Sequence, residues 1–217
     1  MSSIHRSDLP AGRDFSQPAI LLASGSSYRK ELLSRLRLPF QTQAPDIDET
    51  ALEGETAVAT SLRLAIAKAK ALSPRYPNHL IIGSDQVATL DQLHIGKPGD
   101  HQRALEQLLL MSGKTTLFHT ALCLLDNRPG SLHPCQTEII TAEVTLRALT
   151  EAEFDAYLRI EQPYDCAGSA KNEGLGISLI ESIRSTDPTA LTGLPLISLT
   201  SMLRRAGVSF FTNTVSI

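Results

Sequence analysis

The apolar residues of this chain fall into short blocks whose spacing separates strands from helices. Continuous apolar runs at 18–23 and 80–83 predict buried strands, and strict alternation at 140–147 predicts a half-buried strand. Apolar positions at helical spacing predict a helix over 55–72. Further strands are expected at 116–125 and 177–183, and further helices from residue 27, at 101–111, from residue 150, and from 195 to a stop before Gly207.

Strands and helices alternate in the first half of this order, and hairpin signals accumulate in the second half. Such a mixture predicts an α/β fold, with a mixed β-sheet flanked by helices and two lobes with a central cleft. Clefts of that kind are where ligands prefer to bind. Helix-end signals agree, because Thr150 and Glu153 have the spacing of a capping box, and Asp100 and Gly113 frame the helix 101–111.

The segment between the first strand and the first helix, residues 22–33, has the sequence LASGSSYRKELL. Small residues let backbone N–H groups approach an anion, and a helix start adds free N–H donors and the positive end of the helix dipole. Arg29 and Lys30 add positive charge where the dipole does not favour it. The segment suggests a phosphate site, although an ordinary turn with Ser27 as the N-cap fits the same residues.

Charged residues stand at the ends or flanks of other elements. Asp85 follows the strand 80–83, where open α/β sheets place their ligands, although it would also serve as a turn former. Lys68 and Lys70 lie on opposite flanks of the apolar stripe of the helix 55–72, and periodicity does not decide which of them faces a cleft. Three loops carry further charges: Lys97 in a Gly-Lys-Pro turn, Lys171 and Glu173 in the glycine-rich loop 166–176, and Asp187, whose role the sequence leaves open, in the loop 186–195.

Composition narrows the class of protein. A net charge of −3 over 217 residues argues against a general nucleic-acid binder. The three cysteines are widely spaced, which favours a reducing compartment, and no apolar run has the length of a membrane span. Residues 1–17 are polar and are expected to form a flexible extension before a single catalytic domain at 18–217. We expect a cytoplasmic protein without nucleic-acid or membrane partners; a homodimer stays open.

The charged residues in this inventory suit one kind of chemistry. Cleavage of a phosphoanhydride needs basic groups to hold a polyphosphate, and carboxylates to hold a divalent cation and activate water. Magnesium suits such a site, because it takes one or two carboxylates together with phosphate oxygens and keeps several waters. The candidates are Ser24, Ser26, Arg29, Glu49, Lys68, Asp85, Lys97 and Lys171.

Six short motifs resemble, in order, those of the Maf family, nucleoside-triphosphate pyrophosphatases sometimes described as septum-formation inhibitors. They are LASGSSYRKELL at 22–33, DIDE at 46–49, AKA at 67–69, GSDQ at 83–86, GKP at 96–98 and GLP at 193–195. This resemblance implies hydrolysis of a nucleotide to its monophosphate and pyrophosphate with a divalent cation, Mg²⁺ or Mn²⁺. It also implies an elongated mixed sheet related to that of the inosine-triphosphate pyrophosphatases.

The resemblance also assigns roles, residue by residue. Asp85 corresponds to the general base, and Glu49 and Asp85 correspond to the metal-binding carboxylates. Lys68 completes the catalytic set as a phosphate contact. The remaining substrate-binding positions are Ser24, Ser26, Arg29 and Lys97. Ser27 stands where the family usually has proline.

Three positions are similar to those of the 7-methyl-GTP pyrophosphatase subgroup: Tyr28, Gln86 and Glu173. Methylation at N7 makes guanine cationic, and a cationic ring favours an aromatic face such as that of Tyr28. A carboxylate such as Glu173 can accept hydrogen bonds from the guanine N1–H and amino group. The subgroup usually has tryptophan where Tyr28 stands, and core packing remains an alternative role for this side chain.

Two alternative functions stay open from the sequence. One is hydrolysis of dTTP, UTP or another non-standard nucleotide at the same site. The other belongs to a different class, a nucleotide-binding regulator of cell division that acts without turnover. Two carboxylates near phosphate binders argue against the regulator, because they repel the ligand unless a metal or the chemistry requires them.

Overall fold

The computed structural model describes residues 17–211 and shows one mixed β-sheet of seven strands. Its strand order is β2-β1-β3-β5-β6-β7, with β4 paired to the end of β3. The strands are β1 (Ala19–Leu22), β2 (Phe40–Thr42), β3 (His79–Leu90), β4 (Leu93–Ile95), β5 (Thr115–Asp126), β6 (Cys135–Leu146) and β7 (Ile180–Arg184). The helices are α1 (Ser27–Ser34), α2 (Ala57–Leu72), α3 (His101–Met111), α4 (Glu151–Glu161) and α5 (Leu196–Arg205), with short 3₁₀ turns η1 (Ser73–Arg75), η2 (Ala167–Ser169) and η3 (Leu175–Leu179).

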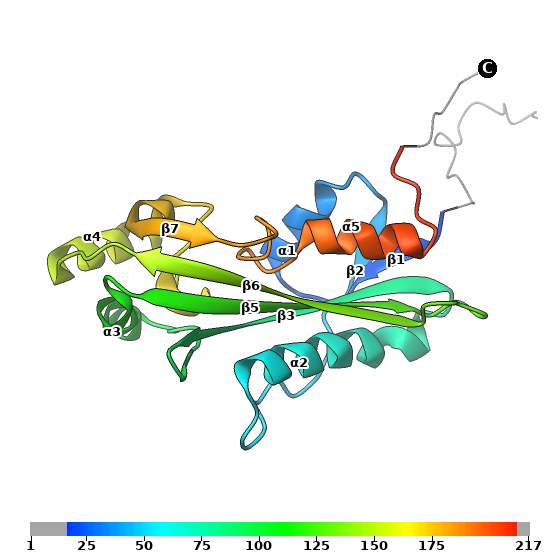
Figure 1. The fold of residues 1–217 in the computed structure, drawn as a ribbon, viewed down its shortest axis with the longest axis horizontal. Coiled ribbons are helices and arrows are strands. Elements are labelled where there is room, and N and C mark those ends of the chain that lie inside the picture. Colours follow the sequence, from blue (N-terminus) through cyan, green and yellow to red (C-terminus); the bar gives the residue numbers. More distant parts are fainter. Residues whose placement is uncertain (1–16, 212–217) are drawn as a thin grey trace, which may run out of the picture.

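The helices cover the sheet unevenly and create two lobes (Figure 1). α2 lies on one face, and α1 and α5 lie on the other face near β1 and β2. α3 and α4 lie at the opposite end of the long strands. Separate buried clusters fill the two ends, one containing Leu80, Leu122 and Leu199, the other containing Leu108 and Phe154. The α/β class with a mixed sheet and two lobes is therefore confirmed.

The strand that carries Asp85 is longer than its apolar run predicts. β3 continues to Leu90 because β5 pairs with it from Leu80 to Thr89. Asp85 therefore lies inside a strand and not just past its end, which corrects the sequence prediction. On its other edge, β3 pairs with β1 only as far as Ile82 and with β4 only from Ala88. Within residues 17–211, no strand occupies the edge of residues 83–87 between these two neighbours.

Helix-end predictions hold at two helices and shift at three. Asp100 caps α3, and Thr150 forms the predicted capping box with Glu153. The cap of α1 is Ser26 and not Ser27. Thr56 caps α2, which therefore begins two residues later than predicted, and Pro195 is the residue before α5 and not its first.

Two strand starts also differ from the prediction. β6 begins at Cys135, five residues before the alternating run, because its backbone pairs with β5 back to Leu125. Residues 175–179 form η3, so that β7 begins only at Ile180. Helical spacing also places Val58 on the apolar stripe of α2, but Val58 is exposed, and the buried face of this helix includes Leu64 and Lys68 instead.

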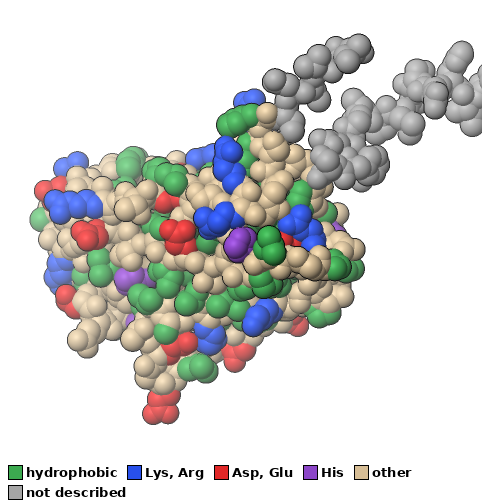
Figure 2. All heavy atoms as spheres, turned by 45° about the vertical axis from the view of Figure 1, so that its right-hand side comes forward, with side chains coloured by type: hydrophobic (Ala, Val, Ile, Leu, Met, Phe, Trp, Pro, Cys, Tyr) green, Lys and Arg blue, Asp and Glu red, His purple; other side chains and the backbone are tan. Residues whose placement is uncertain are grey.

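Surface and termini add little to the fold. Figure 2 shows basic, acidic and apolar side chains interspersed over one face, in keeping with the small net charge. Across the part of the chain that is described, no helix is long and apolar enough to cross a membrane. Apart from Gln17, whose amide exchanges two hydrogen bonds with the backbone of Ser209, the predicted N-terminal extension lies outside the described residues. The domain boundary at residue 18 stays a prediction.

Candidate active site

A cavity of about 780 Å³ lies at the open edge of β3, between the two lobes. The end of β1, the start of α1, the loop before α2 and the turn after β4 all reach it. Loops 165–173 and 191–193 complete its wall. All eleven candidate residues selected from the sequence line this cavity: Ser24, Ser26, Tyr28, Arg29, Glu49, Lys68, Asp85, Gln86, Lys97, Lys171 and Glu173.

The two serines organise the turn into α1. Ser24 is buried and its hydroxyl accepts a hydrogen bond from the backbone N–H of Ser26 at 3.1 Å. The Ser26 hydroxyl then accepts from the backbone N–H of Arg29 at 3.4 Å and caps the helix. The first turn of a helix leaves further N–H groups without partners inside the helix. This cavity wall can therefore accept an anion.

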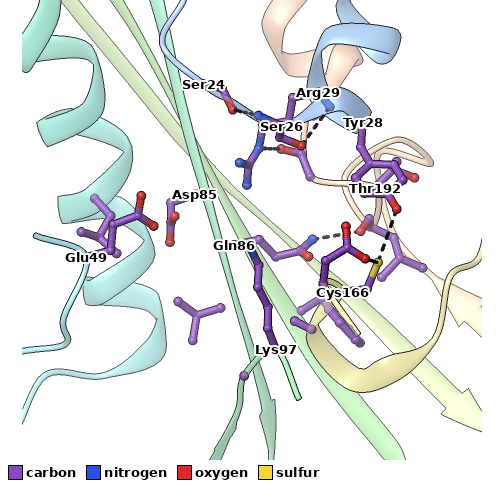
Figure 3. A pocket seen from close by; sticks show the side chains of 18 of the residues that line it. Ser24, Ser26, Tyr28, Arg29, Glu49, Asp85, Gln86, Lys97, Cys166 and Thr192 are labelled. Carbon is purple, nitrogen blue, oxygen red and sulfur yellow. Dashed lines mark hydrogen bonds between the residues drawn. The ribbon is translucent and has the colours of Figure 1, made fainter. Parts of the chain in front are cut away.

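Arg29 projects from the first turn of α1 toward Asp85 (Figure 3). Its Nε donates to the carbonyl of Gly193 at 2.8 Å. Among the described residues, its two Nη groups have no hydrogen-bond partner, so both are available to a ligand. Burial lowers the pKa of the guanidinium, and the carboxylates of Asp85 and Glu49 raise it. The group keeps its charge, because an arginine pKa starts far above neutral pH.

Lys68 lies between two carboxylates from different segments. Its Nζ is 2.7 Å from Oδ1 of Asp85 and 2.9 Å from Oε2 of Glu49. Lys68 and Asp85 are only 5% and 6% exposed, whereas Glu49 is exposed. Burial raises the pKa of Asp85, and the nearby charges of Lys68 and Arg29 oppose that rise. Of the two lysines on α2, it is Lys68 that faces the cleft, and Lys70 is exposed.

The loop that carries Glu49 is tied to α2 by an ion pair. Arg63 donates to the carboxylate of Glu55 at 2.7 Å through both Nε and Nη2, and to the carbonyl of Thr50 at 3.0 Å. Glu55 in turn accepts from the backbone N–H of Leu52. These hydrogen bonds, with that of Arg63 foremost, lower the pKa of Glu55 to about 2. Glu49 is therefore held near Lys68 from outside the cavity.

Tyr28 lies where α1 meets the loop 165–173 in the cavity wall, and its neighbours are polar. It is half-buried and belongs to none of the hydrophobic clusters, so core packing is not its role. The Cys166 thiol lies 3.7 Å from its hydroxyl, and Nζ of Lys171 lies 5.7 Å from its ring centroid. Burial raises the pKa of Cys166 to about 11, so this thiol stays protonated at neutral pH. Glu173 is exposed on the same wall.

Gln86 is more constrained than its predicted role suggests. Its side-chain Nε2 donates to Oγ1 of Thr120 at 2.8 Å and to the carbonyls of Ala190 and Leu191 at 3.1 and 3.0 Å. Its amide nitrogen is thus committed to the protein, and only the amide oxygen remains for a ligand. Base reading by Gln86 stays a prediction.

Sequence reasoning did not assign the groups that hold the 186–195 loop against the sheet. Ser84, which is fully buried, donates to the carbonyl of Gly193 at 2.9 Å, and Thr120 donates to that of Ala190 at the same distance. The dense Thr, Asp, Pro and Gly content of this loop was the available signal. Its partners lie on distant strands and have no local signature.

The carboxylate oxygens in the cavity are suitable ligands for a divalent cation. No group of three or more His, Cys, Asp or Glu side chains suited to a metal occurs among residues 17–211. Asp85 and Glu49 nevertheless face one cationic group from two sides, and both offer oxygen donors. Magnesium and manganese accept such sparse carboxylate sets when phosphate oxygens and waters complete the coordination. These two residues would therefore hold the ion together with a bound nucleotide.

Known proteins are similar to this chain over most of its length. A family model described as "Maf-like protein" matches residues 19–206. A protein of Cupriavidus pinatubonensis named 7-methyl-GTP pyrophosphatase is 59% identical over 89% of this chain and 96% of the relative. Proteins of the same name from Burkholderia pseudomallei (59% identical, covering 90% of this chain and 91% of the relative) and Thiobacillus denitrificans (55%, 90% and 96%) also match. Among solved structures, a nucleoside-triphosphatase / dITP/XTP pyrophosphatase from Mycobacterium abscessus is 15% identical, covering 87% of this chain and 97% of that chain with a TM-score of 0.40.

Proposed function

The chain belongs to the Maf family, and on this premise we propose that it is a metal-dependent nucleotide pyrophosphatase that hydrolyses 7-methyl-GTP to 7-methyl-GMP and pyrophosphate. One observation carries the proposal. A single cavity combines an anion-accepting wall, formed by the start of α1 and Arg29, with the cluster of Lys68, Asp85 and Glu49. Binding a polyphosphate and activating water require these two halves side by side.

The proposed chemistry follows from the positions of the charges. The backbone at the start of α1 and the free Nη groups of Arg29 hold the phosphates, with Lys97 at the rim. Asp85 accepts a proton from the water that attacks the α-phosphorus, and the α–β anhydride bond breaks to release pyrophosphate. A divalent cation at Asp85 and Glu49 would supply positive charge to the phosphates.

The proposed base specificity rests on the wall around Tyr28. Nζ of Lys171 lies 5.7 Å from the centroid of the Tyr28 ring, so this ring already attracts a cation in the free protein. The cationic ring of 7-methylguanine can use the same attraction, and Glu173 can pair with its N1–H and amino group. A desolvated cation–π contact is worth about 2 kcal/mol, which corresponds to roughly thirtyfold in preference over GTP.

The decisive experiment measures pyrophosphate release by the purified protein with Mg²⁺ or Mn²⁺. The substrates 7-methyl-GTP, GTP, dTTP, UTP and ITP are compared side by side. We expect the largest kcat/KM for 7-methyl-GTP. Asp85→Asn should lower kcat by about 10²–10⁴-fold while leaving the fold and nucleotide binding in place. A preference for dTTP or UTP would support pyrophosphatase activity but refute the proposed specificity for 7-methylguanine.

Two variants separate the specificity wall from the reaction. Tyr28→Leu and Glu173→Ala should reduce the preference for 7-methyl-GTP over GTP while hydrolysis of GTP persists. An unchanged ratio of the two substrates would contradict their proposed role. Binding of nucleotides by the wild type without turnover of any of them would instead favour the regulatory alternative.

A further inference from the structure

The 186–195 loop contacts both walls of the cavity. Its Gly193 carbonyl accepts the hydrogen bond from Arg29 on the phosphate side. Its Ala190 and Leu191 carbonyls accept from the side chain of Gln86 on β3. Whatever fixes the shape of this loop therefore fixes the direction of both side chains.

A buried carboxylate lies at the base of the loop. Asp187 is 1% exposed, and its two oxygens accept from four donors. Oδ1 accepts from the backbone N–H of Thr189 at 3.0 Å and from its hydroxyl at 2.7 Å. Oδ2 accepts from the backbone N–H groups of Ile197 at 2.7 Å and Ser198 at 3.4 Å. Asp187 thus closes the loop onto the first turn of α5, where Pro195 offers no side-chain cap.

Thr189 extends this closure to the end of the loop. Its hydroxyl also lies 2.8 Å from the carbonyl of Leu194 and accepts from the backbone N–H of Leu196 at 2.8 Å. The residues on both sides of Gly193 are therefore tied to Asp187, directly or through one hydroxyl group. Together with the Ser84 hydroxyl, which donates to the Gly193 carbonyl at 2.9 Å, this network sets the position of that carbonyl.

Gly193 and Arg29 are in close contact. Gly193 has a φ of +100°, and a Cβ atom placed there would lie 3.3 Å from Nε of Arg29. Glycine is required both by this backbone conformation and by the approach of the guanidinium. Because Nε donates to the Gly193 carbonyl, the plane of the guanidinium is set and its Nη groups are left for a ligand.

We infer that Asp187 is a positioning residue of the cavity, which acts through the Gly193 carbonyl to orient Arg29 toward the nucleotide phosphates. The inference rests on the proposed function for the identity of the ligand, but the orientation itself is a property of the free protein. Asp187 does not line the cavity and touches no substrate in this scheme. Its carboxylate is needed because an asparagine would replace one acceptor oxygen by a donor facing other donors.

The first test needs no ligand. In ¹⁵N-labelled protein the Nε–H signal of Arg29 is identified by its loss in Arg29→Lys, and its exchange with water is measured. We expect Asp187→Asn to speed this exchange at least tenfold, since the donor loses a fixed acceptor. Asp126→Asn is the matched control, because Asp126 is also buried and holds a turn, at the far end of β5. It should leave the Arg29 signal unchanged.

The second test uses a double-mutant cycle on hydrolysis. Asp187→Asn should lower kcat/KM by about 10- to 100-fold, the loss expected when a binding group is displaced by an ångström or less. In an Arg29→Ala background the same substitution should cost almost nothing, because its effect passes through Arg29. Asp126→Asn should lower the melting temperature without this kinetic loss.

Opposite results would overturn the inference. Unchanged Arg29 exchange in Asp187→Asn, or losses that multiply in the double variant, would show that Asp187 is only structural. Should Asp187→Asn fail to fold, Thr189→Val takes its place. It deletes the hydroxyl that links Asp187 to the end of the loop, and the same two measurements apply. A wild type without turnover of any nucleotide would refute the proposed function, while the exchange test would still decide the role of Asp187.

Discussion

The contact between Lys68 and its two carboxylates shows how much one residue contributes to this cavity. A lysine that is 5% exposed is costly unless its charge is paired, and Asp85 and Glu49 pair it from two segments. In the free protein its ammonium therefore occupies the position between the two carboxylates proposed to bind a divalent cation. Cation binding and the Lys68 contacts should compete until phosphates offer Lys68 other partners.

This competition is testable without a nucleotide. Lys68→Met should raise the affinity of the nucleotide-free protein for Mn²⁺, measured by calorimetry. We expect tenfold or more, because a divalent ion and a unit charge 4 Å apart repel by about 2 kcal/mol even in bulk water. Lys97→Met is the matched control, since Lys97 lines the same cavity, is exposed and contacts neither carboxylate. If both variants gained the same affinity for Mn²⁺, the loss of one positive charge near the cavity would explain the effect, and direct competition by Lys68 would be contradicted.

At the scale of elements, the packing of α2 on β3 sets the geometry of the cluster. Gly83 lies directly against the helix, because a Cβ atom there would lie 2.1 Å from the carbonyl oxygen of Ala65 and 3.1 Å from Cβ of Ala69. Lys68 lies one helical turn beyond Ala65, and Asp85 lies two residues beyond Gly83 on the same side of the strand. The close approach of the two elements therefore brings ammonium and carboxylate into contact.

Gly83→Ala should separate the two elements. The inserted methyl group meets backbone and not a flexible side chain, so overpacking should lower the free energy of unfolding by roughly 1–3 kcal/mol. Hydrolysis should fall as well, because the contact between Lys68 and Asp85 is stretched. Urea unfolding and kcat/KM are the measurements. Gly96→Ala is the control for stability, since a Cβ atom there has no neighbour within 4 Å; equal unfolding curves for both variants would refute the packing argument.

At the scale of the whole molecule, the cavity lies between two separate hydrophobic clusters. β3 and β5 contribute residues to both clusters, and the residues that line the cavity also come from both lobes. Arg29 and Lys68 belong to the half containing α1 and α2, whereas Lys97, Cys166 and Glu173 belong to the half containing α3 and α4. A bound nucleotide would contact both halves and hold them together.

Ligand binding should therefore stabilise the entire fold. With Asp85→Asn used to prevent turnover, 7-methyl-GTP and Mg²⁺ at about 100 times the dissociation constant should add about 2.7 kcal/mol. For a chain of this size that corresponds to a rise in melting temperature of roughly 5–11 °C. 7-Methylguanosine, which lacks the phosphates, should give a much smaller rise at equal concentration. A rise of equal size with 7-methylguanosine would argue against the phosphate wall.

The sequence by itself determined the elements whose causes are local. Apolar runs, helical periodicity and capping residues act within a few positions. The sequence therefore predicted both ends of α3, with Asp100 as its cap, and the start of α4 with its Thr150–Glu153 box. The eleven candidate residues were found through short motifs and the glycine-rich loop 166–176, and chain folding brings all of them to one cavity. Their individual roles stay predictions.

Only the tertiary structure decided the features that depend on distant partners. β3 continues past its apolar run because β5 pairs with it, which moves Asp85 from a strand end into an open strand edge. Lys68 is chosen over Lys70 because carboxylates from two other segments pair its charge. Asp187 acquires a role through Gly193 and Arg29, which is 164 residues away from Gly193 in sequence. Pairing, charge compensation and loop closure are interactions between segments, and no local pattern encodes them.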